Sequence, residues 1–272
     1  MDEPSTTQEK SAIEPATPVR TPAVPTPDAA AVAPGKPDTW LARLLRRPDP
    51  LTSIAFTVPV FLVYHLGLLV VDLRAGVDLV SGALLSLLHA SVPAYVIATF
   101  ALTLALAGAV YVQRKRGKLP QLGIAPVLLE SVAFALLLLF AFGWSTHRLA
   151  RTLDDAALQS LGVGAKLVLA AGAGFHEELI FRAVLVTGAA AALVRLVGMH
   201  RTVALVVCLV GSSCLASLAY NFGAFAEPFV LQAFGYRVLA AALLALIYLT
   251  RGFAVAVYTH TFYVALSLFV YA

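Results

Sequence analysis

The residues of this chain best suited to chemistry form a charged cluster within the apolar stretch GAGFHEELIFRAVL, residues 172–185. Glu178 and Arg182 are four residues apart, so on a helix they share a face and can form an ion pair. Glu177 is turned from Glu178 by about 100° in a helix of 3.6 residues per turn. Arg182 can therefore neutralise one carboxylate while the other stays free in surroundings of low dielectric. A free carboxylate of this kind predicts a general base able to activate water.

A structural interpretation competes with this one: a buried Glu178–Arg182 ion pair, with Glu177 solvated at the edge of a cavity. The functional interpretation is favoured because charged groups within a membrane are costly and are rarely kept for packing. The small residues 170–174, Ala-Ala-Gly-Ala-Gly, predict that another helix approaches closely just before the cluster. His176 lies about 200° around the helix from Glu178, so we expect it to face away from the site.

A second candidate is His260, within YTHTFYVAL near the C-terminus. A lone histidine in an apolar helix is often a hydrogen-bonded packing residue. Beside Glu177, however, an imidazole would supply an acid–base partner or a donor to an oxyanion. Glu130 lies near the beginning of a predicted span, where hydration favours a structural role. His65, near the end of the first span, is the remaining ionisable candidate.

The elements that must position these residues are membrane-spanning helices. Of the 272 residues, 60% are hydrophobic and 12% charged, whereas soluble domains have about 45–50% apolar and about 25% charged residues. The net charge of +4 lies largely near predicted helix ends and indicates no nucleic-acid partner. A helix needs about 20 residues to cross a hydrocarbon core. On that criterion we predict seven spans, at residues 51–71, 91–113, 124–145, 164–197, 202–222, 229–250 and 253–271.

The predicted fold class is therefore all-α: a polytopic helical membrane protein with about seven transmembrane helices and a central polar cavity. If consecutive spans alternate in direction, most positive charges flank one side, at Arg43, Arg46, Arg47, the run RKRGK (114–118), Arg195, Arg201 and Arg251. This side is cytoplasmic by the positive-inside rule. The rule predicts a multi-pass protein of the cell membrane with a cytoplasmic N-terminus.

Several segments have separate interpretations. Residues 1–39, rich in Pro, Thr and Ala, predict a disordered cytoplasmic tail, and residues 40–272 predict the helical membrane domain. The stretch WLARLLRRP, residues 40–48, indicates a short interfacial helix. The stretch 78–89 is too short to cross and is predicted to be re-entrant or interfacial. The fourth span is long, so we expect it to tilt, break or extend beyond the bilayer.

The charged cluster also matches a known sequence pattern. EELIFR, residues 177–182, resembles the Glu-Glu-x-x-x-Arg motif of the CPBP family of intramembrane proteases, which includes the type II CAAX prenyl endopeptidases and the ABI proteins. The resemblance covers residues from about 120 to 272 and includes RGFAVAVYTH, which leads to His260. It implies an all-helical protein whose site lies in the bilayer, with Glu177 acting on water and His260 in the same site. The implied activity is hydrolysis of a peptide bond in a membrane-associated substrate.

Two positions depart from the family pattern. The second motif, Phe-x-x-x-His, corresponds to ASLAY, in which Ala216 and Tyr220 replace Phe and His. The third, His-x-x-x-Asn or His-x-x-x-Asp, has Val264 as its last residue. Tyrosine has an unperturbed pKa of about 10 and is a poor base, but Tyr220 or the adjacent Asn221 can still donate a hydrogen bond to an oxyanion.

These replacements also bear on a metal cofactor, which the family label of metalloprotease would suggest to be zinc. Catalytic zinc takes three protein ligands and a water molecule. Glu177 or Glu178 together with His260 supplies two ligands, unless His176 turns inward. We therefore assign no metal ligands, and the cofactor stays unknown.

Three functions are compatible with the sequence. The first is an active CAAX-type intramembrane endopeptidase, whose partners are membrane lipid and a peptide or protein substrate, lipidated or not. The second is a catalytically inactive relative that acts as a membrane binding or immunity protein, since two expected site residues are replaced. The third, a transporter with Glu177 and His260 as a proton relay, is less favoured because the sequence has no internal repeat or paired broken helices.

Overall fold

The computed structural model describes residues 48–71, 87, 91–116, 123–150, 161–222 and 228–270, and of residues 143–150 it describes only the backbone. Contacts divide the chain into Met1–Trp40 and Leu41–Ala272, and every described residue belongs to the second unit. The predicted tail, residues 1–39, and the predicted interfacial helix, residues 40–48, lie outside the described residues, apart from Pro48. The stretch 78–89 also lies outside them, apart from Leu87.

Helices make up the regular structure of the described residues. In chain order they are α2 (Pro50–Gly67), α4 (Val92–Lys115), α5 (Ile124–Ala150), α7 (Val163–Gly172), η2 (Ala173–Ala189), α8 (Ala190–Val197), α9 (Arg201–Ala219), α10 (Leu231–Arg251) and α11 (Phe253–Val270). Within this part of the chain, seven segments are long and apolar enough to cross a membrane, with α7, η2 and α8 counted as one. The predicted all-α, polytopic fold is confirmed, and the helix ends fall within a few residues of the predicted boundaries.

Two glycines end helices at positions of positive φ. Gly198 (φ 71°) follows α8, and its N–H donates to the carbonyl oxygen of Leu193. Gly252 (φ 97°) separates α10 from α11. Glycine adopts positive φ without the steric cost of a Cβ atom. The chain can therefore turn sharply between consecutive spans at both places.

The fourth predicted span is a single helical segment, Val163–Val197, and it does not break. Its middle part, η2, is a π-helix, in which hydrogen bonds join residues five apart and which is frequent at functional sites. The α-helical angle of about 100° between neighbouring side chains therefore does not apply to Glu177 and Glu178. Their predicted difference in surroundings has to be judged from contacts instead.

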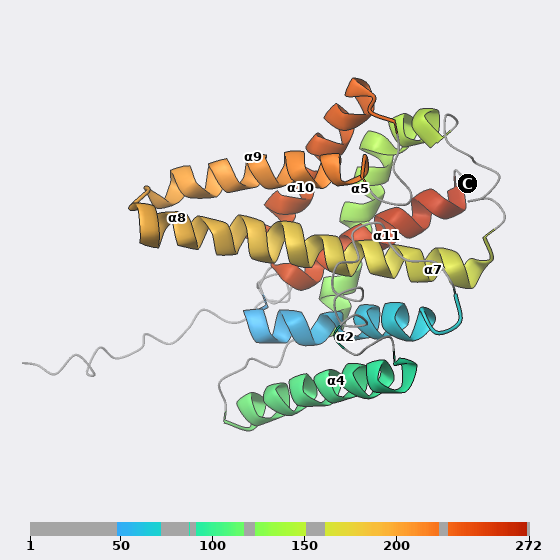
Figure 1. The fold of residues 1–272 in the computed structure, drawn as a ribbon, viewed down its shortest axis with the longest axis vertical. Helices are drawn as coiled ribbons and strands as arrows, with labels where there is room; N and C mark the ends of the chain where they lie inside the picture. The colour runs from blue at the N-terminus through green and yellow to red at the C-terminus, as the bar shows by residue number, and fades with distance from the viewer. Residues whose placement is uncertain are drawn as a thin grey trace, which may run out of the picture. The chain divides into compact units, whose positions relative to one another are not determined.

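α11 lies in the interior of the helical bundle. It packs against α2, α5, α7, α10 and η2, and η2 packs in addition against α9 (Figure 1). The first half of α11, from Phe253 to His260, is buried throughout. Together with apolar residues of α2, α5, α7 and α10, it forms the largest core cluster of the described residues. This packing holds η2 between α9 and α11, the helices that complete its polar cluster.

The contacts of Glu130 support the structural role predicted for it. Its carboxylate, on α5, accepts hydrogen bonds from Nε and Nη2 of Arg251 at the end of α10, the second at 2.9 Å. Both side chains are partly exposed, Glu130 by 19% and Arg251 by 16%. The pair brings the beginning of α5 to the end of α10, as the predicted alternation of spans requires.

Candidate active site

The helices η2 and α11 approach each other closely at Gly174. A Cβ atom at this position would lie 2.0 Å from Oγ1 of Thr261 and 2.8 Å from its backbone nitrogen. The two backbones are thus nearly in contact, which confirms that the run of small residues admits a neighbouring helix. Because Glu178 follows Gly174 on η2 and His260 precedes Thr261 on α11, this approach brings the two side chains together.

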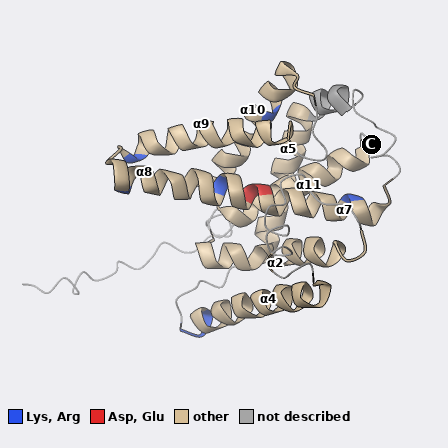
Figure 2. Ribbon diagram, in the orientation of Figure 1, with Lys and Arg blue, Asp and Glu red and all other residues tan. Residues whose placement is uncertain are grey.

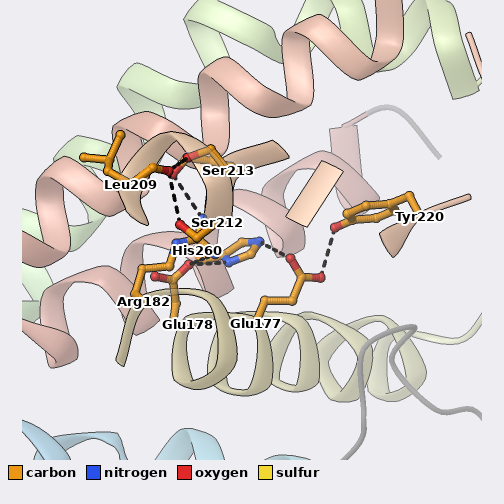
Figure 3. Close-up of polar contacts among 9 residues, drawn as sticks. Glu177, Glu178, Arg182, Leu209, Ser212, Ser213, Tyr220 and His260 are labelled. Atoms are coloured by element: carbon orange, nitrogen blue, oxygen red, sulfur yellow. Dashed lines mark hydrogen bonds and ion pairs between the residues drawn. The ribbon is translucent and has the colours of Figure 1, made fainter. Parts of the chain in front are cut away.

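Glu178 is fully buried and lies between two nitrogen-bearing side chains (Figure 3). Nδ1 of His260 is 2.8 Å from Oε1 of Glu178, and Nη1 of Arg182 is 3.2 Å from the same oxygen. Arg182 also donates from Nη2 to the carbonyl oxygen of Ala241 on α10 at 3.2 Å. The predicted Glu178–Arg182 ion pair is confirmed, and it is tied to both α10 and α11.

Glu177 is 6% exposed, and its carboxylate is bound rather than free. The hydroxyl of Tyr220, directly after α9, donates to Oε1 of Glu177 at 3.0 Å. The other oxygen, Oε2, lies 3.9 Å from Nε2 of His260. The expectation of a free carboxylate is therefore wrong, because α9 delivers a hydrogen-bond donor to it. The two glutamates still differ as predicted, since Arg182 pairs with Glu178 and Tyr220 with Glu177.

Charge gathers in the middle of the long helical segment, where Figure 2 shows acidic and basic residues next to one another. Two carboxylates, one guanidinium and one imidazole meet there, and all four side chains are at least nine-tenths buried. Arg182 balances the negative charge of Glu178, which limits the desolvation cost of burying that pair. Each ring nitrogen of His260 faces one carboxylate, Nδ1 that of Glu178 and Nε2 that of Glu177.

Glu177 and His260 face each other at a distance that a bridging water molecule can span. Oε2 and Nε2 are 3.9 Å apart, too far for a direct hydrogen bond, and polar groups separated by more than about 3.5 Å are often bridged by water. A water molecule at this place would touch a carboxylate base and an imidazole donor at once. The arrangement can therefore perform general acid–base chemistry on water.

The CPBP resemblance implies that Glu177 and His260 share one site, and the contacts bring these two residues together with Glu178 and Arg182. No family model, curated protein or solved structure matches the chain. The family assignment therefore stays a prediction from the motif residues. What the site does has to be inferred from its geometry.

The donor set does not fit a zinc ion. Both ring nitrogens of His260 face carboxylates, Nδ1 at 2.8 Å from Glu178 and Nε2 at 3.9 Å from Glu177. The guanidinium of Arg182 already places a positive charge 3.2 Å from Glu178. Catalytic zinc needs three protein ligands besides water, and within the described ranges no three His, Cys, Asp or Glu side chains are arranged to hold a metal ion. These residues are suited instead to activation of water by a carboxylate alone.

His176 belongs to a different cluster, as predicted. Its ring packs against Tyr64 and His65 on α2, with centroids 4.8 and 5.4 Å away, and its Nδ1 lies 3.1 Å from the carbonyl oxygen of Gly172. Nδ1 of His65 is hydrogen-bonded to the hydroxyl of Tyr95 on α4. His65 and His176 therefore join η2 to α2 and α4 and take no direct part in the candidate site.

The remaining predicted donor, Asn221, lies in the turn after α9, where its backbone N–H donates to Leu218 at 2.9 Å. Its role at an oxyanion stays a prediction. Sequence reasoning missed Arg237 of α10, whose guanidinium carbon lies 4.7 Å from the centre of the Tyr220 ring. A signal for it was present, because an arginine near the beginning of an apolar span is itself a reason to suspect function.

Proposed function

We propose that this protein is an intramembrane endopeptidase of the CPBP type, which hydrolyses a peptide bond in a membrane-associated substrate with water activated by Glu177. The observation that carries the proposal is the placement of the two carboxylate oxygens of Glu177. Oε1 accepts from Tyr220 at 3.0 Å, and Oε2 faces Nε2 of His260 at 3.9 Å. The resemblance of EELIFR to the family motif supports the same assignment.

Each polar group has a separate task in the proposed reaction. Glu177 accepts a proton from a water molecule, and the hydroxide formed attacks the carbonyl carbon of the scissile amide. His260 donates from Nε2 to the oxyanion of the tetrahedral intermediate. When the C–N bond breaks, Glu177 returns its proton to the leaving nitrogen, so that the site recovers its starting charge. Glu178, balanced by Arg182, holds His260 in the orientation that these steps need.

The proposal includes an orientation in the cell membrane with the N-terminus in the cytoplasm. Arg195 is in the last turn of α8, Arg201 begins α9 and Arg251 ends α10. If consecutive spans alternate, these three positions lie on one side, which the positive-inside rule assigns to the cytoplasm. The proposed partners are membrane lipid and a peptide or protein substrate.

A catalytically inactive family member, acting as a membrane binding or immunity protein, is the second candidate. Tyr220 stands where the family motif has a histidine, and its hydroxyl already donates to Glu177. His260 is likewise bonded to Glu178. Buried polar groups that satisfy one another in this way can also serve only to make a unique, rigid core.

Purified full-length protein in detergent, incubated with prenylated and unprenylated fluorogenic peptides, tests the proposal. Glu177→Gln preserves shape but removes the base, so kcat should fall by about 10²–10⁴-fold, and His260→Ala should also lower it strongly. Glu130→Gln removes a carboxylate from another span and is the matched control, with kcat largely unchanged. Cleavage that survives both site substitutions would reject the assignment. A wild-type protein that cleaves no peptide would favour the binding function.

A further inference from the structure

Arg237, in the second turn of α10, brings a further cation to the candidate site. Its Cζ atom lies 4.7 Å from the centre of the Tyr220 ring, within the range of about 6 Å over which a cation and an aromatic face attract each other. The hydroxyl of the same ring donates to Oε1 of Glu177 at 3.0 Å. The three side chains therefore form a continuous series that runs from α10, through the end of α9, to the proposed base on η2.

The place of Tyr220 in the chain explains why it needs support from another helix. It directly follows the last residue of α9, where the helix gives way to a turn. A ring in such a position has no following helical turn to pack against, and rotation about its side-chain torsions would carry the hydroxyl away from Glu177. α10 lies against α9 at this level, because Oγ of Ser217 donates to the carbonyl oxygen of Phe234 at 3.0 Å. Ser217 precedes Tyr220, and Phe234 precedes Arg237, by three residues each.

We infer that Arg237 is a positioning residue for the proposed peptidase. Its guanidinium holds the ring of Tyr220 in the orientation in which the hydroxyl donates to Oε1 of Glu177. The other oxygen, Oε2, then remains to act on water beside His260. The inference rests on the proposed function, and it adds a residue that acts through Tyr220 rather than on the substrate. The attraction also works on the hydroxyl itself, since a cation over the ring draws electron density from the phenol and makes its O–H a stronger donor.

A simpler role for Arg237, filling space between two helices, predicts different behaviour. An arginine within a span is costly to retain, and an apolar side chain would fill the same space at less cost. If packing were its whole role, removal of the charge would change stability without changing the hydrogen bond of Tyr220. The two roles therefore separate in any measurement that reports on the hydroxyl.

Kinetics with four variants form the first arm of the test: Arg237→Gln, Arg237→Lys, Tyr220→Phe and the double variant Arg237→Gln/Tyr220→Phe. Arg237→Gln should lower kcat by roughly three- to thirtyfold with KM unchanged, and Arg237→Lys, which keeps the cation, should recover part of the loss. The double variant should be no slower than Tyr220→Phe alone, because both substitutions act through one hydroxyl. A further loss of the same size in the double variant would overturn the inference.

The second arm needs no cleavage. Tyrosine labelled with ¹³C at Cζ gives a separate NMR signal for each ring, and Tyr220→Phe identifies the signal of Tyr220. Arg237→Gln should shift that signal, whereas Arg251→Gln, at the other end of the same helix, should leave it in place. Arg237→Met, an apolar side chain of similar reach, gives the same comparison in case Arg237→Gln does not fold.

The two arms separate failure of the inference from failure of the proposed function. A Tyr220 signal that does not move in Arg237→Gln or Arg237→Met overturns the positioning role, even in a protein that cleaves peptides. A signal that moves in a protein without any cleavage upholds the control of Tyr220 by Arg237 and rejects the peptidase alone.

Discussion

Substitution of Gly174 by alanine offers the most direct test of how the candidate site is assembled. The new Cβ atom would lie 2.0 Å from Oγ1, 2.8 Å from the backbone nitrogen and 2.9 Å from Cα of Thr261. Rotation of the Thr261 side chain can relieve the first contact only. The other two involve the backbone of α11, so the substitution has to push η2 and α11 apart.

The size of the effect follows from these distances. Non-bonded atoms usually meet at about 3.5–4.0 Å, so the two backbones must separate by roughly 0.6–1.2 Å. The Nδ1–Oε1 bond between His260 and Glu178, now 2.8 Å, would then exceed the limit of about 3.2 Å for a good hydrogen bond. Overpacking costs about 1–3 kcal/mol, against about 0.5–1 kcal/mol gained by replacing a helical glycine with alanine. We expect the free energy of unfolding to fall by about 1 kcal/mol, within a range of about 0–2.5 kcal/mol.

Reversible unfolding in mixed micelles of increasing SDS content, followed by circular dichroism, measures this change. Gly188→Ala is the matched control, because a Cβ atom there lies in ordinary contact, 3.7 Å from the carbonyl oxygen of Ala183, in the same helix. Gly174→Ala should be less stable than wild type, and Gly188→Ala equally or more stable. Thr261→Ala in the Gly174→Ala background should restore only part of the loss, since it removes Oγ1 but not the backbone contacts.

Two results would refute the reasoning. If Gly174→Ala is as stable as Gly188→Ala, η2 and α11 do not approach as closely as described. If Thr261→Ala restores stability completely, the backbones are not the limiting contact, and the position of His260 over Glu178 does not depend on Gly174.

Three further predictions concern the contacts that hold the helices around the site. Gly67→Ala should destabilise the protein by about 1–3 kcal/mol, since its Cβ would lie 2.2 Å from a methyl group of Val168. Because this clash is with a side chain, Val168→Ala should rescue the loss of stability, which a double-mutant cycle in SDS unfolding measures. Arg251→Leu should lower stability by about 1–3 kcal/mol, because Glu130 is left partly buried without its donor; a charge swap, Glu130→Arg with Arg251→Glu, that recovers nothing would contradict the pairing. Lys166→Met should lower the free energy of unfolding by about 0.5–1.5 kcal/mol, because the carbonyl oxygen of Leu268 in the last turn of α11 loses its donor at 3.0 Å. The expected result is a lower thermal midpoint than wild type with the same helix content.

Much of the fold could be predicted from the chain alone because the relevant signals are local. A span is recognised by its own length and hydropathy, so the seven predicted segments coincide with the helices from α2 to α11. The Glu178–Arg182 pair was predictable for the same reason, since both residues lie within one turn of one helix. The small residues before them likewise predicted that another helix approaches closely, but they did not identify that helix.

What could not be predicted depends on residues far apart in the chain. His260 was expected to act beside Glu177, yet its direct hydrogen bond is to Glu178, 82 residues away. The choice between two adjacent carboxylates depends on the rotation of a π-helix and on the approach of α11 at Gly174. Neither has a signature in a local pattern built on 3.6 residues per turn.

The contacts of Tyr220 and Arg237, on the other side of the site, also join residues far apart in the chain. The sequence by itself determined that ionisable groups lie within apolar helices, and the cost of burying charge makes such groups find partners. Only the tertiary structure decided which partners they find, because α9 ends where Tyr220 can reach Glu177 and α10 crosses where Arg237 covers the Tyr220 ring. The hydropathy of a span depends only on its own residues, so it can be determined from the sequence of that span. Hydrogen bonds and ion pairs between spans require a particular packing of several helices.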